Sequence, residues 1–158
     1  MAVQTKILLI GFGNPGRADD GLGPAAAEYF EKKNLPGVTV ECDYQLTVED
    51  CAAAAQNDIV IFVDASVNCR EPFVFEPLKP KESGSFSSHS VEPAEVLALA
   101  KKLFNSNVKG FVLGIRGYTF DMFEEKMTEK AGYNLQKAVE FLENILTTKD
   151  FSKFVSCA

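Results

Sequence analysis

The chain has 158 residues, of which 46% are hydrophobic and 24% are charged. These values are ordinary for a globular protein, and the length suits a single domain, residues 1–158, with a sizeable core. The formal net charge of −6 argues against a nucleic-acid partner, which would require a basic surface.

The first apolar segment, Ile7–Ile10, is far too short to span a membrane. It also lacks the basic flank and the small-residue cleavage site that mark a signal peptide. We therefore expect no membrane partner, a cytoplasmic location and, by default, a monomer. The sequence has no C-x-x-C pair, so a thiolate zinc site is not expected. We expect ordinary thiols in a reducing compartment at Cys42, Cys51, Cys69 and Cys157.

Strand and helix patterns alternate almost throughout the sequence. The expected strands are Lys6–Gly11, Val38–Cys42, Ile59–Asp64, a short strand near an edge at Phe73–Pro77, and Gly110–Ile115. The expected helices are Pro24–Lys33, Val48–Gln56 with Thr47 as its N-cap, Glu92–Phe104, and a long helix over about 124–146. Residues 150–158 are expected to form a tail, from which Phe151, Phe154 and Val155 can dock on the body.

This alternation predicts an α/β fold: a three-layer α/β/α sandwich with a mostly parallel sheet of about five strands. The run Ile59–Asp64 is apolar on both faces, as in a parallel strand covered by helices. We expect the flavodoxin-like strand order 2-1-3-4-5. The functional site should then lie beyond the carboxyl ends of strands 1 and 3, where the winding of the sheet reverses.

The segment after the first strand, Gly11–Gly23, contains a literal G-x-G-x-x-G. In dinucleotide-binding folds this motif holds a pyrophosphate on amides and a helix N-terminus, with a carboxylate about 20 residues further on. Here Pro15 lacks an amide donor and the pair Asp19-Asp20 would repel phosphate, while Glu41 or Asp43 lies at a longer spacing. A dinucleotide site is therefore the less favoured interpretation.

Bacterial peptidyl-tRNA hydrolases also carry a GNPG segment after their first strand, as Gly13–Gly16 does here. Those enzymes place a histidine soon afterwards, whereas this chain has the acidic pair Asp19-Asp20 and an unsuitable net charge for tRNA. A simpler interpretation of the acidic pair is helix capping just upstream of Pro24. One aspartate could cap while the other points into the crevice.

Asp64 ends the third expected strand, so Asp64 and Asp20 should face each other across the reversal point of the sheet. Taken alone, Asp64 would more simply start a turn with Ser66. His89, the single histidine, precedes the helix that begins near Glu92 and could equally be a solvated loop residue. A loop in that position can nevertheless fold over the same end of the sheet.

Two carboxylates and an imidazole suit a divalent transition metal such as nickel or zinc, and three protein ligands leave open positions for catalysis. Asp20, Asp64 and His89 are therefore the candidate metal ligands and catalytic residues. A serine hydrolase is disfavoured because Ser87, Ser88 and Ser90 adjoin His89 in one loop, and no G-x-S-x-G turn is present.

In order and spacing, these motifs resemble the [NiFe]-hydrogenase maturation endopeptidases over about residues 6–140. The resemblance rests on Gly11-x-Gly13-Asn14-x4-Asp19-Asp20-Gly21-x-Gly23, Ile61–Ser66, Ser88–Pro93, Gln45–Thr47, and Gly114-Ile115 with Gly117 and Phe120-Asp121. The Gln45–Thr47 variant looks closest to family members that serve soluble, cytosolic hydrogenases. Gly16 is a small departure, since a bulky apolar residue is more usual there.

The resemblance implies that Asp20, Asp64 and His89 engage a metal. It also implies an endopeptidase that trims the C-terminus of a hydrogenase large-subunit precursor already carrying nickel, so that cleavage waits for correct metal loading. Nickel would then belong to the substrate, and zinc or cadmium could take its place in a crystal. The alternative of another class is a non-catalytic nickel-binding maturation chaperone on the same scaffold.

Overall fold

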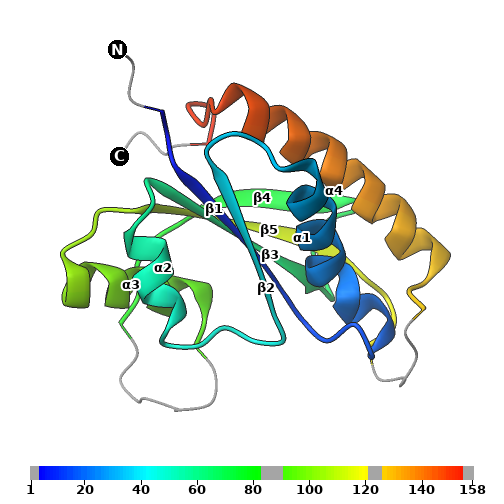
Figure 1. Cartoon of the computed structure of the whole chain (residues 1–158). Coiled ribbons are helices and arrows are strands. Elements are labelled where there is room, and N and C mark those ends of the chain that lie inside the picture. The colour runs from blue at the N-terminus through cyan, green and yellow to red at the C-terminus, as the bar shows by residue number, and fades with distance from the viewer. Residues whose placement is uncertain (1–3, 83–90, 121–125, 155–158) are drawn as a thin grey trace.

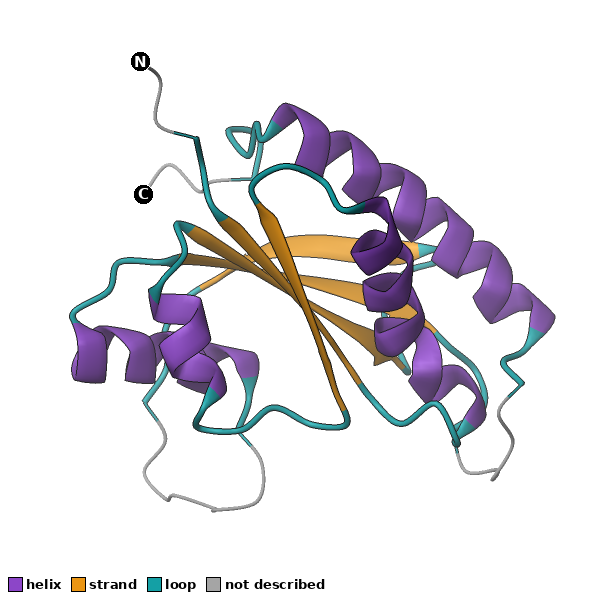
Figure 2. Ribbon diagram, viewed as in Figure 1, coloured by secondary structure: helices purple, strands orange, loops and turns teal. Residues whose placement is uncertain are grey.

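A computed structural model of the chain describes residues 4–82, 91–120 and 126–154. Within these ranges the chain forms one five-stranded sheet with helices on both faces, which confirms the predicted α/β/α sandwich (Figures 1 and 2). The elements in chain order are β1 (Ile7–Phe12), the 3₁₀ helix η1 (Ala18–Gly21), α1 (Leu22–Lys33), β2 (Val38–Asp43), α2 (Asp50–Ala55), β3 (Ile59–Ser66), β4 (Phe73–Leu78), α3 (Pro93–Phe104), β5 (Lys109–Arg116) and α4 (Glu129–Thr148).

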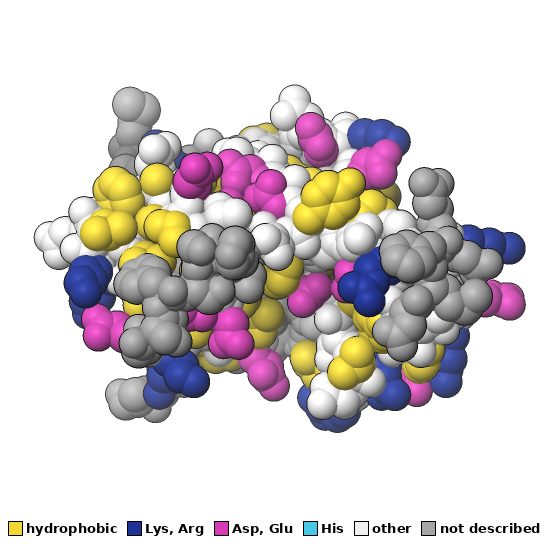
Figure 3. Space-filling model, turned by 90° about the horizontal axis from the view of Figure 1, so that it is seen from below, with side chains coloured by type: hydrophobic (Ala, Val, Ile, Leu, Met, Phe, Trp, Pro, Cys, Tyr) yellow, Lys and Arg dark blue, Asp and Glu magenta, His cyan; other side chains and the backbone are white. Residues whose placement is uncertain are grey.

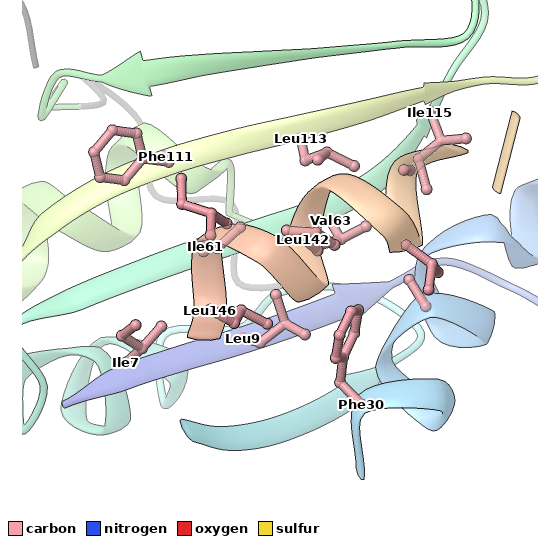
Figure 4. Packing of buried hydrophobic residues seen from close by; sticks show 14 of the residues in the cluster. Ile7, Leu9, Phe30, Ile61, Val63, Phe111, Leu113, Ile115, Leu142 and Leu146 are labelled. Atoms are coloured by element: carbon pink, nitrogen blue, oxygen red, sulfur yellow. The ribbon is translucent and has the colours of Figure 1, made fainter. Parts of the chain in front are cut away.

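The apolar residues of the central strands divide between two cores because successive side chains point to opposite faces of a sheet. On one face, covered by α1 and α4, lies a cluster that includes Leu9, Ile61 and Leu113 (Figure 4). On the other face, covered by α2 and α3, lie Ile10 and Phe62. This double burial explains why β1 and β3 read as continuous apolar runs rather than as alternating patterns.

The strand order is β2-β1-β3-β5-β4, so the predicted order 2-1-3-4-5 is wrong for the last two strands. Six residues, 67–72, join β3 to β4, and a parallel neighbour would need a crossover of a dozen or more residues. The strand β4 instead pairs with β5 in the antiparallel direction at the edge of the sheet. The prediction of β4 as an edge strand is confirmed, and the reversal point between β1 and β3 is unaffected.

Two helices begin later than predicted. The helix α2 has Glu49 as its N-cap rather than Thr47, although the Asp50 carboxylate accepts the Thr47 amide at 2.8 Å. The helix α4 begins at Glu129, capped by the Thr128 hydroxyl, which accepts the Ala131 amide, and residues 126–128 are not helical. The helical periodicity of the apolar residues therefore continues beyond the actual starts of these helices. Hydrogen bonds between side chains and backbone amides mark those starts.

The predicted tail is docked as far as Phe154. Phe151 is buried and stacks on Phe111, with 5.1 Å between ring centroids. Phe154 meets Phe75 edge-on at 4.9 Å. The segment after α4 therefore closes the core of the α1–α4 face, whereas Val155 lies outside the described residues.

The start of α1 lies directly against the ends of the two central strands. A Cβ atom at Gly23 would stand 2.5 Å from the carbonyl oxygen of Val63 in β3 and 2.9 Å from the amide nitrogen of Phe12 in β1. Both neighbours are backbone atoms within the sheet, so they cannot move aside. Only glycine lets the helix reach this position, and the turn that precedes α1 is thereby held over the gap between β1 and β3.

We predict that Gly23→Ala lowers the free energy of unfolding by about 3 kcal/mol, since the new methyl group meets fixed backbone on two strands. The matched control is Gly132→Ala in α4, where nothing lies within 4 Å of the added Cβ. That control should raise stability by about 0.5–1 kcal/mol, because alanine loses less conformational entropy in a helix than glycine does. Urea unfolding monitored by circular dichroism measures both. Similar stability changes in the two variants would contradict this account.

Candidate functional site

The turn between β1 and α1 places Asp20 at the carboxyl end of the sheet. The Asp20 amide donates to the Arg17 carbonyl at 3.1 Å, and the Asp20 carboxylate accepts the Asn14 amide at 2.9 Å. The Asn14 side chain in turn accepts the Gly16 amide at 2.9 Å. Gly13 has a φ of 141°, a value that glycine adopts readily. The turn is therefore closed by its own polar groups, with one Asp20 oxygen fixed on the backbone.

Asp64 lies near the end of β3, in register with Gly114 of β5. Its carboxylate accepts the amide of Ala65 at 2.8 Å. Burial raises the pKa of Asp64 to about 7, the Ala65 hydrogen bond opposes that rise, and the negative charge of Asp20 adds to it. The two predicted carboxylates are thus electrostatic neighbours across the reversal point between β1 and β3, as the sequence indicated.

Asp19 lies beside Asp20 in the chain but faces the interior and has no exposed surface. Its carboxylate accepts four hydrogen bonds, from the Tyr118 amide at 2.7 Å, the Thr119 amide at 3.1 Å, the Thr128 amide at 2.7 Å and the Thr128 hydroxyl at 2.8 Å. Burial raises the pKa of the Asp19 carboxyl, but these hydrogen bonds outweigh it and bring the pKa below its usual value. Asp19 therefore remains an anion inside the protein.

The capping interpretation of the acidic pair is wrong. The N-caps of η1 and α1 are Arg17 and Gly21, and neither helix start has a capping hydrogen bond from a side chain. Asp19 instead bonds to residues about 100 positions further along the chain, including Thr128 at the start of α4. Sequence spacing gave no signal for this long-range role, because nothing local connects Asp19 with Thr128.

His89 and the serines beside it, Ser87, Ser88 and Ser90, lie outside the described residues. The structure therefore brings together two of the three predicted ligands, Asp20 and Asp64. The nearest described residue, Val91, donates its amide to the Leu46 carbonyl at 3.3 Å, which fixes the start of the α3 segment beside the β2–α2 connection.

A second group of carboxylates, not predicted as a metal site, lies at the end of β2. Glu41, Asp43 and Asp50 each offer an oxygen atom within 4.8 Å of the other two, and they are the only such group found in the described part of the chain. Burial raises the pKa of Glu41, and the negative charges of Asp50 and Asp43 add to that rise. Burial also raises the pKa of Asp50; hydrogen bonds from Thr47 oppose this rise and Asp43 adds to it. Residues 41 and 43 share one face of β2, which is the sequence signal that could have located this group.

A cavity of about 420 Å³ lies beside this group and beside the Asn14–Asp20 turn. Its walls come from the β1–α1 turn and from the end of β2: Gly13, Pro15, Pro24, Cys42, Asp43 and Tyr44. Figure 3 views the molecule from the edge that carries the carboxyl ends of β1, β2 and β3, and shows several acidic side chains across this face. The carboxyl end of the sheet thus combines an apolar recess with negatively charged side chains.

The dinucleotide interpretation has a physical obstacle in this turn. A pyrophosphate would need the free amides of the Gly11–Gly16 segment, but the Asn14 and Gly16 amides already donate to the side chains of Asp20 and Asn14. A carboxylate occupies the place where a phosphate oxygen would be bound. The glycines serve close packing instead, since a Cβ atom at Gly11 would stand 2.8 Å from the Cβ atom of Ala27 in α1.

No protein-family model matches the chain. A protein of Methanocaldococcus jannaschii, provisionally named as a hydrogenase maturation protease, is 30% identical over 155 residues that cover 88% of this chain and 95% of the relative. The chain belongs to the hydrogenase maturation proteases. The [NiFe] hydrogenase maturation protease HycI of Thermococcus kodakarensis has a similar structure, with a TM-score of 0.69, 25% identity and coverage of 90% and 92% of the two chains.

The hydrogenase maturating endopeptidase HybD of Escherichia coli shares the fold of this maturation protease, with a TM-score of 0.71, 20% identity and coverage of 91% and 93%. These likenesses extend over nearly the whole of each chain. Among the described residues, no helix combines the length and the apolar character that crossing a membrane requires. The family assignment and the resemblance found in the sequence motifs agree.

We predict that the Asp64 carboxyl of the metal-free protein titrates near pH 7 in a carbon-detected NMR experiment. The raised pKa means that the folded state binds a proton more tightly than the unfolded state, in which the pKa is near its usual 3.8. The contribution of Asp64 protonation to the free energy of unfolding therefore has its full value below about pH 4 and is lost as the pH rises through 7.

The stability of wild type relative to Asp64→Asn should therefore fall between about pH 4 and pH 7, and then level off. Asp20→Asn should lower the pKa of Asp64, because the neighbouring negative charge is removed. A stability difference that does not change over this pH range would contradict the assigned environment of Asp64.

Proposed function

We propose that this maturation protease removes the C-terminal peptide of a [NiFe]-hydrogenase large-subunit precursor that already carries nickel. In this proposal Asp20, Asp64 and His89 contact the nickel of the bound precursor. The main support for this proposal is that Asp20 and Asp64 lie near each other at the reversal point of the sheet, where α/β folds bind their ligands. Membership of the family supports the same activity.

The donor set fits a transition metal held by the substrate. Two carboxylates and an imidazole are hard-to-borderline ligands, and three protein groups leave positions for the ligands that the precursor brings. One oxygen of Asp20 is bound to the Asn14 amide, and one oxygen of Asp64 to the Ala65 amide. Such backbone hydrogen bonds orient a ligating carboxylate in the way that outer-shell partners do at metal sites.

The protonation of Asp64 offers a physical basis for a metal checkpoint. With a pKa of about 7, the carboxyl is partly protonated at neutral pH, because a second negative charge beside Asp20 is costly in a buried position. A cation brought by the loaded precursor removes this cost and releases the proton. A precursor without nickel supplies no such cation, so Asp64 would stay partly protonated and would not offer a second anionic ligand.

Nickel, when bound, supplies a Lewis acid that polarises the scissile carbonyl or lowers the pKa of a water molecule. The chain's own contribution is to hold two oxygen ligands on rigid elements and, through Asp64, to take up or release a proton near pH 7. The acidic group of Glu41, Asp43 and Asp50 on the same edge favours a basic segment in the substrate. We further propose that the protease works in the cytoplasm as a monomer, without nucleic acid or membrane.

The experiment that tests this function mixes purified protein with nickel-loaded or nickel-free precursor of the large subunit and follows the precursor C-terminus by mass spectrometry. We expect a short peptide to be lost from the nickel-loaded form alone. Tight binding of the loaded precursor without any cleavage would instead support the non-catalytic nickel chaperone. Equal cleavage of both forms would exclude the metal checkpoint.

The ligand assignment is tested with Asp20→Asn, Asp64→Asn and His89→Ala in the same assay. Each should lower the processing rate at least about 100-fold, a scale typical for loss of one stabilising group at an active site. The matched control is Asp58→Asn, an exposed carboxylate just before β3 that bonds the Lys6 amide at the opposite end of the same strand. That control should process like wild type, and normal processing by Asp64→Asn would remove Asp64 from the site.

A further inference from the structure

Asp19 forms more hydrogen bonds through its carboxylate than any other described carboxylate near the site, yet the proposed chemistry does not use it. Both of its oxygens are occupied, by the Tyr118 and Thr119 amides and by the amide and hydroxyl of Thr128. Its own amide also donates to the Thr119 carbonyl at 2.9 Å. A buried anion with this many partners fixes the position of its backbone as well as that of its side chain.

The partners of Asp19 are themselves fixed to the body of the protein. Asn134, buried in α4, donates to the Arg116 carbonyl at 3.0 Å and to the Tyr118 hydroxyl at 2.9 Å. Thr128 caps α4, so the Asp19 carboxylate lies at the N-terminus of a 20-residue helix, where negative charge is favoured. Gly117 permits the close approach, since a Cβ atom there would stand 2.9 Å from the Cβ atom of Asp19.

The turn that Asp19 holds contains a strained residue, although local hydrogen bonds close it. Ala18, immediately before Asp19, has a φ of 51°, a left-handed conformation that is unfavourable for a residue with a side chain. The single turn of η1, which begins at Ala18, carries Asp20, and neither η1 nor α1 receives a capping hydrogen bond from a side chain at its start. The hydrogen bonds of Asp19 are therefore long-range contacts that offset this strain and, together with the Asn14 amide, fix the position of Asp20.

We propose that Asp19 is a positioning residue that holds the Asp20 carboxylate opposite Asp64 by tying the η1 turn to Tyr118–Thr119 and to the start of α4. This inference rests on the proposed function of Asp20. It gives the two neighbouring aspartates separate tasks: Asp20 meets the substrate metal, and Asp19 binds only the protein.

The test compares Asp19→Asn with wild type in the processing of nickel-loaded precursor, at a temperature where both are fully folded. Asparagine keeps the size of the side chain but replaces one acceptor oxygen with a donor that faces other donors. We expect kcat to fall at least about tenfold, because misplacement by about 1 Å can cost up to about 100-fold in rate. KM should change less than about threefold, since Asp19 does not touch the precursor.

Two further comparisons separate positioning from simple destabilisation. Thr128→Ser keeps the hydroxyl donor and should retain the wild-type kcat, whereas Thr128→Val removes that donor and should lower kcat in the direction of Asp19→Asn. Leu146→Ala, a fully buried site far along α4, serves as the destabilised control and should lower Tm without changing kcat. If Asp19→Asn lowers Tm but leaves kcat unchanged, Asp19 has a structural role alone and the inference is overturned.

The same assay keeps this inference separate from the proposed function. Loss of processing in Asp20→Asn with normal kcat in Asp19→Asn would reject only the positioning role. Normal processing in Asp20→Asn would reject the proposed site itself, whatever Asp19→Asn does.

Discussion

The close contact between the start of α1 and the ends of β1 and β3 is the constraint on which the site depends. Gly23 allows it, because any side chain there would overlap the Val63 carbonyl. The contact forces the chain to turn sharply between Phe12 and Leu22, and the acidic pair lies within that turn. A helix set further from the sheet would carry Asp20 away from Asp64 and weaken the interaction of their charges.

The carboxylates of Asp19, Asp20 and Asp64 differ because their surroundings differ. Asp19 is fully buried and ionised, since four donors surround it. Asp64 has one amide donor and a like charge nearby, so burial prevails and its pKa rises to about 7. Asp20 keeps one oxygen on the Asn14 amide. In the proposed function Asp19 thus gives rigidity, while Asp20 and Asp64 bind the cation.

The sequence was sufficient for the layers of the fold and for the proximity of Asp20 and Asp64. Continuous apolar runs such as Ile59–Asp64 indicated buried parallel strands, and the reversal rule placed Asp20 beside Asp64. The predicted strand order was wrong for β4, because the position of this strand depends on the short 67–72 connection, and strand patterns alone do not take connection length into account. The sequence also gave no sign of the Asp19–Thr128 contact, which joins segments about 100 residues apart. The place of His89 stays a prediction.

The most direct test of the central claim is where a metal ion binds when the protein is crystallised with cadmium and the ion is located by anomalous diffraction. We expect a peak between Asp20 and Asp64, with carboxylate oxygens from both residues coordinating the ion. The opposite outcome is equally specific, because the chain has a second acidic group at the end of β2. A peak at Glu41, Asp43 and Asp50 with none at Asp20 and Asp64 would contradict the claim that the reversal point is the active centre.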